Sequence, residues 1–215
     1  MSKKRITILI DHESWILPYG KKLQLALENL GYQVCLARDS EDIASGWINF
    51  LLGCTRILNK HTLNRNEHNL VVHESSLPTG KGFAPMAWQI LEGKTRISVC
   101  LIEAAVEVDS GCIWLEDQIV LSGDELCEDW RQLQGEKTIE LCLRFVSEYK
   151  VLKPVDQLGE STYYRRRQPV DSELDPDKSI RAQMNLLRVV DNLRYPAFFN
   201  INGVKYQIQI KKAQK

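Results

Sequence analysis

Two side chains that could take part in proton transfer stand at the end of one predicted strand and in a turn between two others. His73 ends the apolar run Leu70–His73 and begins a loop rich in Ser, Pro, Gly and Lys. In open α/β sheets ligands bind beyond the carboxyl ends of the strands, so an imidazole at this place is a candidate acid or base. Asp109 lies further along, in a turn that continues with Ser110 and Gly111. A carboxylate beside a histidine orients the ring and stabilises its protonated form.

The same residues also have simpler explanations. A lone histidine at a strand end is more often a hydrogen-bonded structural residue, and Asp-Ser-Gly is usually only a turn. The stretch Gly80-Lys81-Gly82 is not a phosphate-binding P-loop, because Ser75 stands in place of the first glycine and Gly82 in place of Ser or Thr. Spacing alone leaves open whether His73 and Asp109 meet.

Length and composition are those of an ordinary soluble globular protein. The chain has 215 residues, of which 44% are hydrophobic and 26% charged, which suits one large domain or a domain with a small lobe. The 28 basic and 28 acidic residues give zero formal net charge, so the overall basic field of non-specific nucleic-acid binders is missing. The apolar run Ile6–Ile10 is too short for a signal peptide or a membrane helix, which predicts a cytoplasmic protein without a membrane partner.

The cysteines and histidines lack metal-binding spacing. Six cysteines stand at positions 35, 54, 100, 112, 127 and 142, and none forms a Cys-x-x-Cys pair. No His-Glu-x-x-His pattern occurs among the four histidines. We therefore expect reduced, partly buried thiols and no metal site.

The amino-terminal part has the pattern of a parallel α/β sheet. Arg5–Ile10 predicts a strand buried on both faces, Lys21–Leu30 a helix ended by Gly31, and Tyr32–Ala37 a second strand. This β-α-β opening lacks Gly-x-Gly-x-x-Gly after its first strand, so the dinucleotide fingerprint is missing. The other predicted elements are helices at Glu41–Phe50, Ala84–Leu91 and Asp124–Tyr149 (the last with a break near Gly135), a short strand or turn at Cys54–Leu58, and strands at Leu70–His73, Ile97–Glu103 and Cys112–Ile119.

The composition changes after Pro154. A polar stretch with the basic run Arg165–Arg167 precedes an amphipathic helix that is predicted at Ser179–Asn192. We therefore divide the chain into a catalytic domain, residues 1–155, and a small carboxy-terminal lobe, residues 156–215.

The chain ends in a predicted β-hairpin. Asn202-Gly203 stands between the alternating segments Ala197–Ile201 and Val204–Ile210, a strong signal for a type I′ turn. The hairpin could pair with a second subunit or stay as an edge protected by its lysines, so a monomer and a homodimer both remain open.

Three segments, in the right order, resemble the formyltransferase family that uses 10-formyltetrahydrofolate. Arg56-Ile57-Leu58 resembles the family's Arg-Ile-Leu turn. The run His73–Pro78, together with Gly82, resembles its signature His-x-Ser-Leu-Leu-Pro-x-x-x-Gly, and Val108–Gly111 resembles Val-Asp-x-Gly. The tail is similar to the region after the catalytic domain in compact sugar N-formyltransferases. The resemblance implies an α/β fold: a Rossmann-like formyltransferase domain with a mostly parallel sheet, followed by a small α+β lobe.

The resemblance also implies an activity. The protein would move a formyl group from 10-formyltetrahydrofolate to the amine of a nucleotide-linked 4-amino sugar, with UDP as the expected nucleotide and a pseudaminic-acid-type pathway of surface-glycan synthesis as the nearest match. His73 would accept the proton of the amine or stabilise the oxyanion, and Asp109 would hold His73. No metal and no nucleic-acid partner are implied.

Contact residues follow from the same resemblance. The folate would lie against Arg56, Ile57, Leu58, Glu103, Val106 and Val108. The acceptor substrate would contact Ser75, Lys81, Gly82, Phe83, Arg165, Arg166 and Tyr195. The arginines could equally form a solvated face, and Tyr195 could belong to the core of the hairpin.

One position departs from the family pattern. The family places an Asn two residues before the histidine, where it holds the developing oxyanion, whereas this chain has Val71. Losing one such donor costs about 10²–10³ in rate. We therefore expect a relocated donor, which would be Asn69, Asn59 or a backbone amide of the loop 75–82.

Two other functions stay open. A methionyl-tRNA formyltransferase shares the chemistry, but the short segment after residue 155 and the neutral charge argue against a tRNA partner. A catalytically silent folate-binding module is suggested by Val71 and opposed by the presence of both His73 and Asp109.

Overall fold

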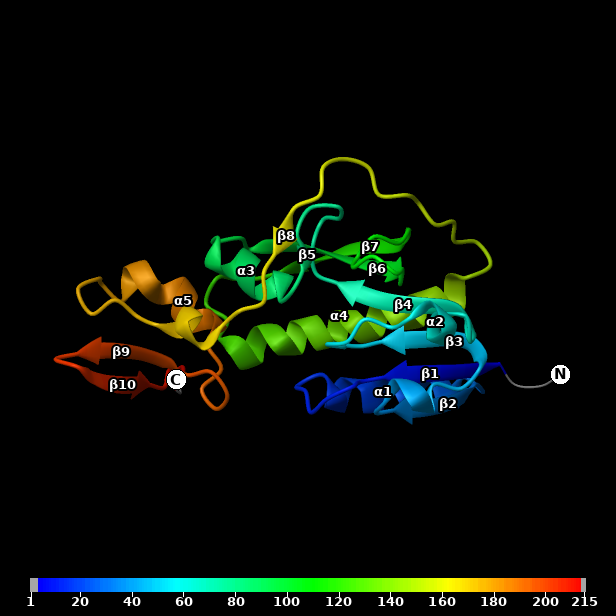
Figure 1. Cartoon of the computed structure of the whole chain (residues 1–215), viewed down its shortest axis with the longest axis horizontal. Helices are drawn as coiled ribbons and strands as arrows, with labels where there is room; N and C mark the ends of the chain where they lie inside the picture. The colour runs from blue at the N-terminus through cyan, green and yellow to red at the C-terminus, as the bar shows by residue number, and fades with distance from the viewer. Residues whose placement is uncertain (1–3, 214–215) are drawn as a thin grey trace.

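A six-stranded sheet carries the residues singled out above (Figure 1). The computed structural model describes residues 4–213. The strands run in the order β2-β1-β3-β4-β6-β7, and the pairs among the first four are parallel while β6 and β7 add antiparallel pairs. Their bounds are β1 Arg5–Leu9, β2 Gln33–Ala37, β3 Gly46–Leu51, β4 Asn66–His73, β6 Arg96–Glu103 and β7 Ile113–Val120. The predicted α/β fold with a mostly parallel sheet is confirmed.

Two helices cover one face of the sheet, α1 (Leu17–Asn29) and α4 (Cys127–Glu148). The predicted break of the long helix near Gly135 is wrong, because α4 continues through this residue. A Cβ atom at Gly135 would lie 2.5 Å from the ring of Tyr19 on α1. The glycine therefore serves the close packing of α1 against α4 rather than a bend.

The predicted helix at Glu41–Phe50 is also wrong. The segment forms a short 3₁₀ turn, Ser40–Asp42, followed by the central strand β3. Strand β3 is almost fully buried because it lies between β1 and β4 with packing on both faces, and its apolar run therefore lacks strand alternation. A Cβ atom at Gly46 would lie 2.8 Å from the carbonyl oxygen of Arg5, so this strand must begin with glycine.

The carboxy-terminal lobe lies at the end of the molecule opposite the amino terminus (Figure 1). Its hairpin, β9 (Ala197–Ile201) and β10 (Val204–Ile208), is confirmed. Asn202 and Gly203 both have positive φ, at 52° and 78°, as a type I′ turn requires. The predicted helix at Ser179–Asn192 is shorter and consists of a 3₁₀ turn, Arg181–Gln183, followed by α5 (Met184–Val189). It ends there because Val190 turns extended and packs into the core of the lobe.

The remaining elements are short. They are α2 (Lys60–Leu63), α3 (Pro85–Leu91), β5 (Lys81–Gly82), β8 (Tyr163–Tyr164) and a 3₁₀ turn at Pro169–Ser172. No helix within residues 4–213 is both long and apolar enough to cross a membrane.

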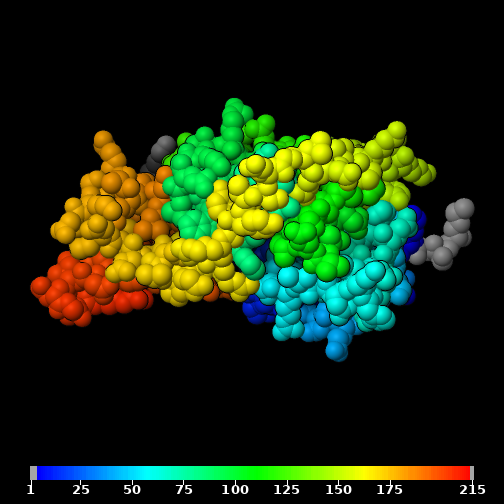
Figure 2. Space-filling view, turned by 45° about the horizontal axis from the view of Figure 1, so that its top comes forward, coloured from blue at the N-terminus to red at the C-terminus, as the bar shows by residue number. Residues whose placement is uncertain are grey.

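An extended stretch, residues 150–168, joins α4 to the lobe, and we call it the linker. It arches past β6 and β7 and then descends along β5, where β8 pairs with β5 in parallel (Figure 1). Figure 2 shows this stretch in yellow. It runs across the surface over the green segments and reaches the orange and red lobe. Most of the linker therefore belongs spatially to the part of the molecule that holds His73.

A buried ion pair joins the lobe to the part of the molecule that contains the six-stranded sheet. Arg188 of α5 is 2% exposed, and its Nη2 atom lies 3.3 Å from Oε2 of Glu125. The Glu125 carboxylate also accepts hydrogen bonds from the backbone of Ser122 and Gly123. Burial raises the pKa of this carboxyl, but the hydrogen bonds outweigh burial and lower the pKa to about 2.

We expect Glu125→Gln to lower the free energy of unfolding at pH 7 by about 3–5 kcal/mol, because Arg188 then stays buried without its counter-charge. The folded-state pKa lies below the ordinary value of 4.5. The stabilisation is therefore complete above that value and is lost as the pH falls toward 2. Urea titrations at pH 7 and at about pH 3 measure both effects. The exposed Glu128→Gln serves as the control, and a difference of equal size at both pH values would contradict the prediction.

Candidate active site

A cavity of about 610 Å³ opens at the carboxyl ends of β3 and β4. His73 and Asp109 both line it. One part of the wall is apolar and includes Ile57, Leu58, Val71, Ala104 and Val108, whereas another part is formed by α4 and by the lobe. The cavity thus lies where open α/β sheets bind ligands, and it passes over the edge of the sheet from one face to the other.

The structure brings His73 and Asp109 together. His73 is 4% exposed, and its Nε2 atom lies 2.8 Å from the carbonyl oxygen of Gly80. A carbonyl oxygen only accepts, so Nε2 carries a hydrogen atom and the lone pair of the neutral ring is on Nδ1. Nδ1 lies 3.5 Å from Oδ2 of Asp109. Nδ1 is therefore the atom that takes up a proton, beside a carboxylate that stabilises the resulting imidazolium.

The loop around Asp109 fixes its carboxylate by backbone contacts. Oδ2 of Asp109 accepts a hydrogen bond from the amide of Gly82 at 2.8 Å. The Gln157 side chain donates to the carbonyl oxygens of both Asp109 and Gly111, each at 2.8 Å. A Cβ atom at Gly111 would lie 1.8 Å from the carbonyl oxygen of Glu103, so only glycine fits where the loop meets the strand. Asp109 itself has a positive φ of 51°.

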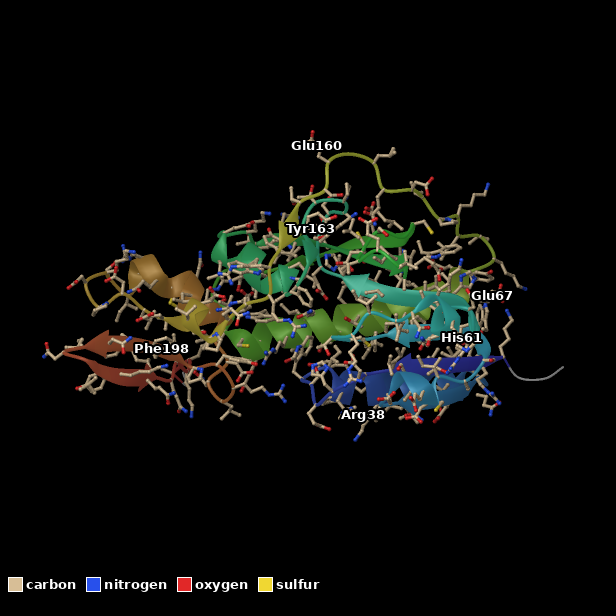
Figure 3. All side chains as sticks on the ribbon, viewed as in Figure 1. Arg38, His61, Glu67, Glu160, Tyr163 and Phe198 are labelled. Atoms are coloured by element: carbon tan, nitrogen blue, oxygen red, sulfur yellow. The ribbon has the colours of Figure 1, made fainter. Side chains whose placement is uncertain are left out.

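The linker holds the loop that carries Gly80 and Gly82. The amide of Gly80 donates to Oγ1 of Thr162 at 2.8 Å, and the amide of Lys81 donates to the carbonyl oxygen of Thr162 at 2.9 Å. The amide of Phe83 donates to the carbonyl oxygen of Tyr164 at 3.0 Å. Tyr163, labelled in Figure 3, lies at this crossing, whereas Glu160 points outward from the top of the arch. The linker thus holds His73 through the loop at Gly80, and it holds Asp109 through Gln157, although it is distant from both in sequence.

Asp11 holds the turn that precedes α2. Its carboxylate accepts hydrogen bonds from the backbone amides of Thr55 and Arg56 at 3.0 Å. Burial raises the pKa of Asp11, but hydrogen bonds from His12, Thr55 and Arg56 outweigh burial, so the pKa is lowered. Burial raises the pKa of the nearby Cys54 thiol to about 12, which makes this cysteine a poor nucleophile. The sequence analysis missed Asp11, although a carboxylate directly after a buried strand was an available signal.

The predicted folate contacts divide into two groups. Ile57, Leu58 and Val108 line the cavity. The other three, Arg56, Glu103 and Val106, are not part of its wall. The Arg56 side chain lies 3.7 Å from Asp39, the Glu103 carboxylate accepts from the indole of Trp114, and Val106 is 67% exposed.

The predicted substrate contacts divide in the same way. Gly82, Phe83, Arg166 and Tyr195 line the cavity. Ser75, Lys81 and Arg165 do not. Ser75 and Lys81 are buried within the loop 75–82, at 2% and 5% exposed, while Arg165 forms an ion pair with Asp171 and stacks over Trp88.

The donors expected to replace the family's asparagine have other partners. Val71, which stands where the resembled family has an asparagine, lines the cavity. The side chain of Asn69 donates to the carbonyl oxygen of Leu63, and that of Asn59 caps α2. In the loop 75–82, the described hydrogen bonds engage the amides of Ser75, Thr79, Gly80, Lys81 and Gly82.

Polar residues at the end of β4, on α4 and in the lobe complete the wall, and the sequence analysis did not select them. They are Glu74, Arg131, Gln134, Thr138 and Arg194. Arg131, Gln134 and Thr138 follow one another at helical spacing on a single face of α4. Polar side chains on the inward face of a helix were the available signal.

We expect Thr162→Val to loosen the loop at Gly80, because the amide of Gly80 loses its acceptor at a cost of about 1–3 kcal/mol. Hydrogen–deuterium exchange should show faster exchange at Gly80–Phe83 and unchanged exchange in β1 and β3. Thr162→Ser keeps the hydroxyl and should exchange like the unaltered protein. Equal exchange in the valine variant would show that Thr162 does not hold this loop.

Comparison with known proteins places this geometry in a known fold. No family model matches the chain. The methionyl-tRNA formyltransferase from Clostridium thermocellum matches with a TM-score of 0.82 and 19% identity, over 98% of this chain and 94% of that one. HypX from Aquifex aeolicus, in complex with tetrahydrofolic acid, matches with a TM-score of 0.80 and 16% identity over 95% of this chain, which spans 37% of that protein.

A 4-N formyltransferase from Francisella tularensis matches over 99% of both chains, with a TM-score of 0.73 and 16% identity. At these identities the likeness is one of fold. It extends over nearly the whole chain, including the lobe. The protein has the formyltransferase fold.

Proposed function

We propose that the protein is an N-formyltransferase that moves a formyl group from 10-formyltetrahydrofolate to a primary amine. The observation that carries the proposal is the orientation of His73. Its Nε2 atom donates to the carbonyl oxygen of Gly80, so Nδ1 is left as the proton acceptor. Asp109 lies beside Nδ1, in a cavity with one apolar and one polar wall. The named formyltransferases of the same fold and the tetrahydrofolic acid bound to HypX support it.

The apolar wall fits a folate. Ile57, Leu58, Val71, Ala104 and Val108 offer a surface on which a flat heteroaromatic ring can pack. The cavity volume lies in the usual range for small-molecule sites. When bound, 10-formyltetrahydrofolate supplies the formyl group.

His73 and Asp109 supply the proton chemistry of the transfer. An amine that attacks a formyl carbon becomes positively charged at nitrogen, while negative charge develops on the formyl oxygen. Nδ1 of His73 takes the proton from nitrogen as the bond forms. Asp109 stabilises the imidazolium, which in turn lies close enough to the reaction to stabilise the oxyanion. The oxyanion then needs no asparagine at position 71.

We further propose that the amine belongs to a nucleotide-linked amino sugar. Arg131, Arg166 and Arg194 all line the cavity, and guanidinium groups match the oxygens of a diphosphate. A sugar N-formyltransferase from Shewanella shares the fold at a TM-score of 0.70. Methionyl-tRNA is the competing acceptor, because the Clostridium enzyme matches this chain over 94% of its own length.

We expect the protein to add one formyl group to a member of a panel of UDP-linked 4-amino sugars, each incubated with 10-formyltetrahydrofolate and read by mass spectrometry. Methionyl-tRNA belongs in the same panel. His73→Ala should abolish the mass gain, because the proton acceptor is lost. Folate binding without transfer to any acceptor would favour a silent folate-binding module, and transfer to the tRNA alone would correct the substrate.

We expect Asp109→Asn to lower kcat about 10²–10³-fold, because the amide cannot stabilise the imidazolium of His73. The amide retains an oxygen that can accept from Gly82, so the fold should be kept. Steady-state kinetics with the preferred acceptor, together with circular dichroism, measure both effects. A kcat within threefold of the unaltered protein would exclude Asp109 from the mechanism.

A further inference from the structure

Glu74 is a buried carboxyl in the cavity for which the proposed mechanism has no use. It directly follows His73, it lines the same cavity, and it is 8% exposed. Along β4, Val71 packs against the cluster that contains Leu58, whereas Val72 packs against the main core, which contains residues of α4. Side chains alternate between the faces of a strand. Glu74 comes directly after the last residue of β4, and its neighbour on the α4 side of the cavity is the Gln134 side chain.

Nothing within residues 4–213 neutralises this carboxyl by an ion pair, since no Lys, Arg or His nitrogen lies within 4.0 Å of it. Burial raises its pKa, although the charge of His73 and a hydrogen bond from the Gln134 side chain partly oppose the rise. Oε1 of Gln134 is buried without a hydrogen-bond partner. An unpaired buried carboxyl destabilises a fold, so its presence beside the catalytic histidine points to a ligand that pairs with it.

The groups around Glu74 leave it as the one carboxyl on the α4 side of the described cavity wall. Asp109 is committed to His73 and Gly82. The other charged or titratable groups of the wall are His12, Cys54, Arg131, Arg166, Arg194 and Tyr195. Arg131 forms an ion pair with Asp191, and Arg194 donates a hydrogen bond to the carbonyl oxygen of Glu13. Both cations therefore have partners other than Glu74.

An acceptor amine poses a protonation problem that His73 alone does not solve. Near neutral pH a primary amine is an ammonium ion, which has no lone pair and cannot attack. Two protons must leave the nitrogen, one before attack and one as the new bond forms. Nδ1 of His73 accounts for one of them.

We infer that Glu74 is a further catalytic residue, which binds the acceptor amine as an ammonium ion and takes its first proton. This inference rests on the proposed function. The ammonium and the Glu74 carboxylate become a free amine and a carboxylic acid. The amine nitrogen then bonds to the formyl carbon as the bond from that carbon to the folate nitrogen breaks. His73 accepts the second proton and passes it to the folate nitrogen, which leaves as an N–H group, and Glu74 later releases the first proton to solvent.

The burial that raises the pKa of the carboxyl also drives this transfer. Burial disfavours the carboxylate form of Glu74, and moving a proton to it from the bound ammonium ion removes one negative and one positive charge from the buried site. Gln134 can hold the carboxyl in either state, because an amide both donates and accepts hydrogen bonds.

The test compares pH profiles of kcat/KM for the unaltered protein and for Glu74→Gln, with a UDP-linked 4-amino sugar as acceptor. At pH 7 the variant should be lower by about 10²-fold. The deficit should shrink to less than tenfold near pH 10, where solvent has already deprotonated the amine. Glu74→Asp, which keeps a carboxyl group, should recover part of the activity at pH 7. Glu140→Gln, on the exposed side of α4, removes the same charge outside the cavity and should behave like the unaltered protein.

Binding of 5-formyltetrahydrofolate, followed by fluorescence, should be unchanged in Glu74→Gln, because Glu74 lies on the α4 side of the cavity rather than in the apolar wall; this binding also reports that the variant is folded. A profile identical to that of the unaltered protein, or a deficit of equal size at every pH, would overturn the role of Glu74. No transfer by the unaltered protein would instead contradict the proposed function itself.

Discussion

A single carbonyl oxygen determines what His73 can do. Because the oxygen of Gly80 accepts a hydrogen bond from Nε2, the imidazole is held in one orientation and one neutral tautomer. Nδ1 is then the basic atom, and it lies beside Asp109. If the loop at Gly80 moved, the ring would lose both its orientation and its choice of tautomer, even with every catalytic side chain still present.

The sheet topology explains why the chemistry lies at one edge with two unlike walls. Parallel strands β3 and β4 end together, so the loops that follow them open at one place. Strand β6 runs antiparallel to β4 and ends at Glu103, beside Leu70, and the loop that follows it carries Asp109 back to within 3.5 Å of His73. Val71 near the end of β4 belongs to the apolar wall, and Glu74 just after β4 belongs to the polar wall beside α4. One strand end thereby contributes to both walls of the cavity.

The sequence was most informative where a pattern is local. Buried strands, the Asn202-Gly203 turn and the loops of His73 and Asp109 carry their signals in adjacent residues, and the structure places that histidine beside that aspartate. The failures come from packing between distant segments. Strand β3 was misread because burial on both faces removes alternation, and Gly135 because its need for glycine arises from Tyr19. Thr162 and Gln157 carry no local mark, since their importance depends on loops far away in the chain.

The linker also orders events in time as the chain is made. Gly80 and Thr162 are separated by 82 positions, and Asp109 and Gln157 by 48. Synthesis proceeds from the amino terminus, so β1 to β7 can assemble on the ribosome before the linker emerges. During that interval the loop at Gly80 lacks its anchors, and the base at His73 is not yet held in one tautomer. A chain that stops before the linker could therefore form its sheet and still lack the contacts that orient His73 and Asp109.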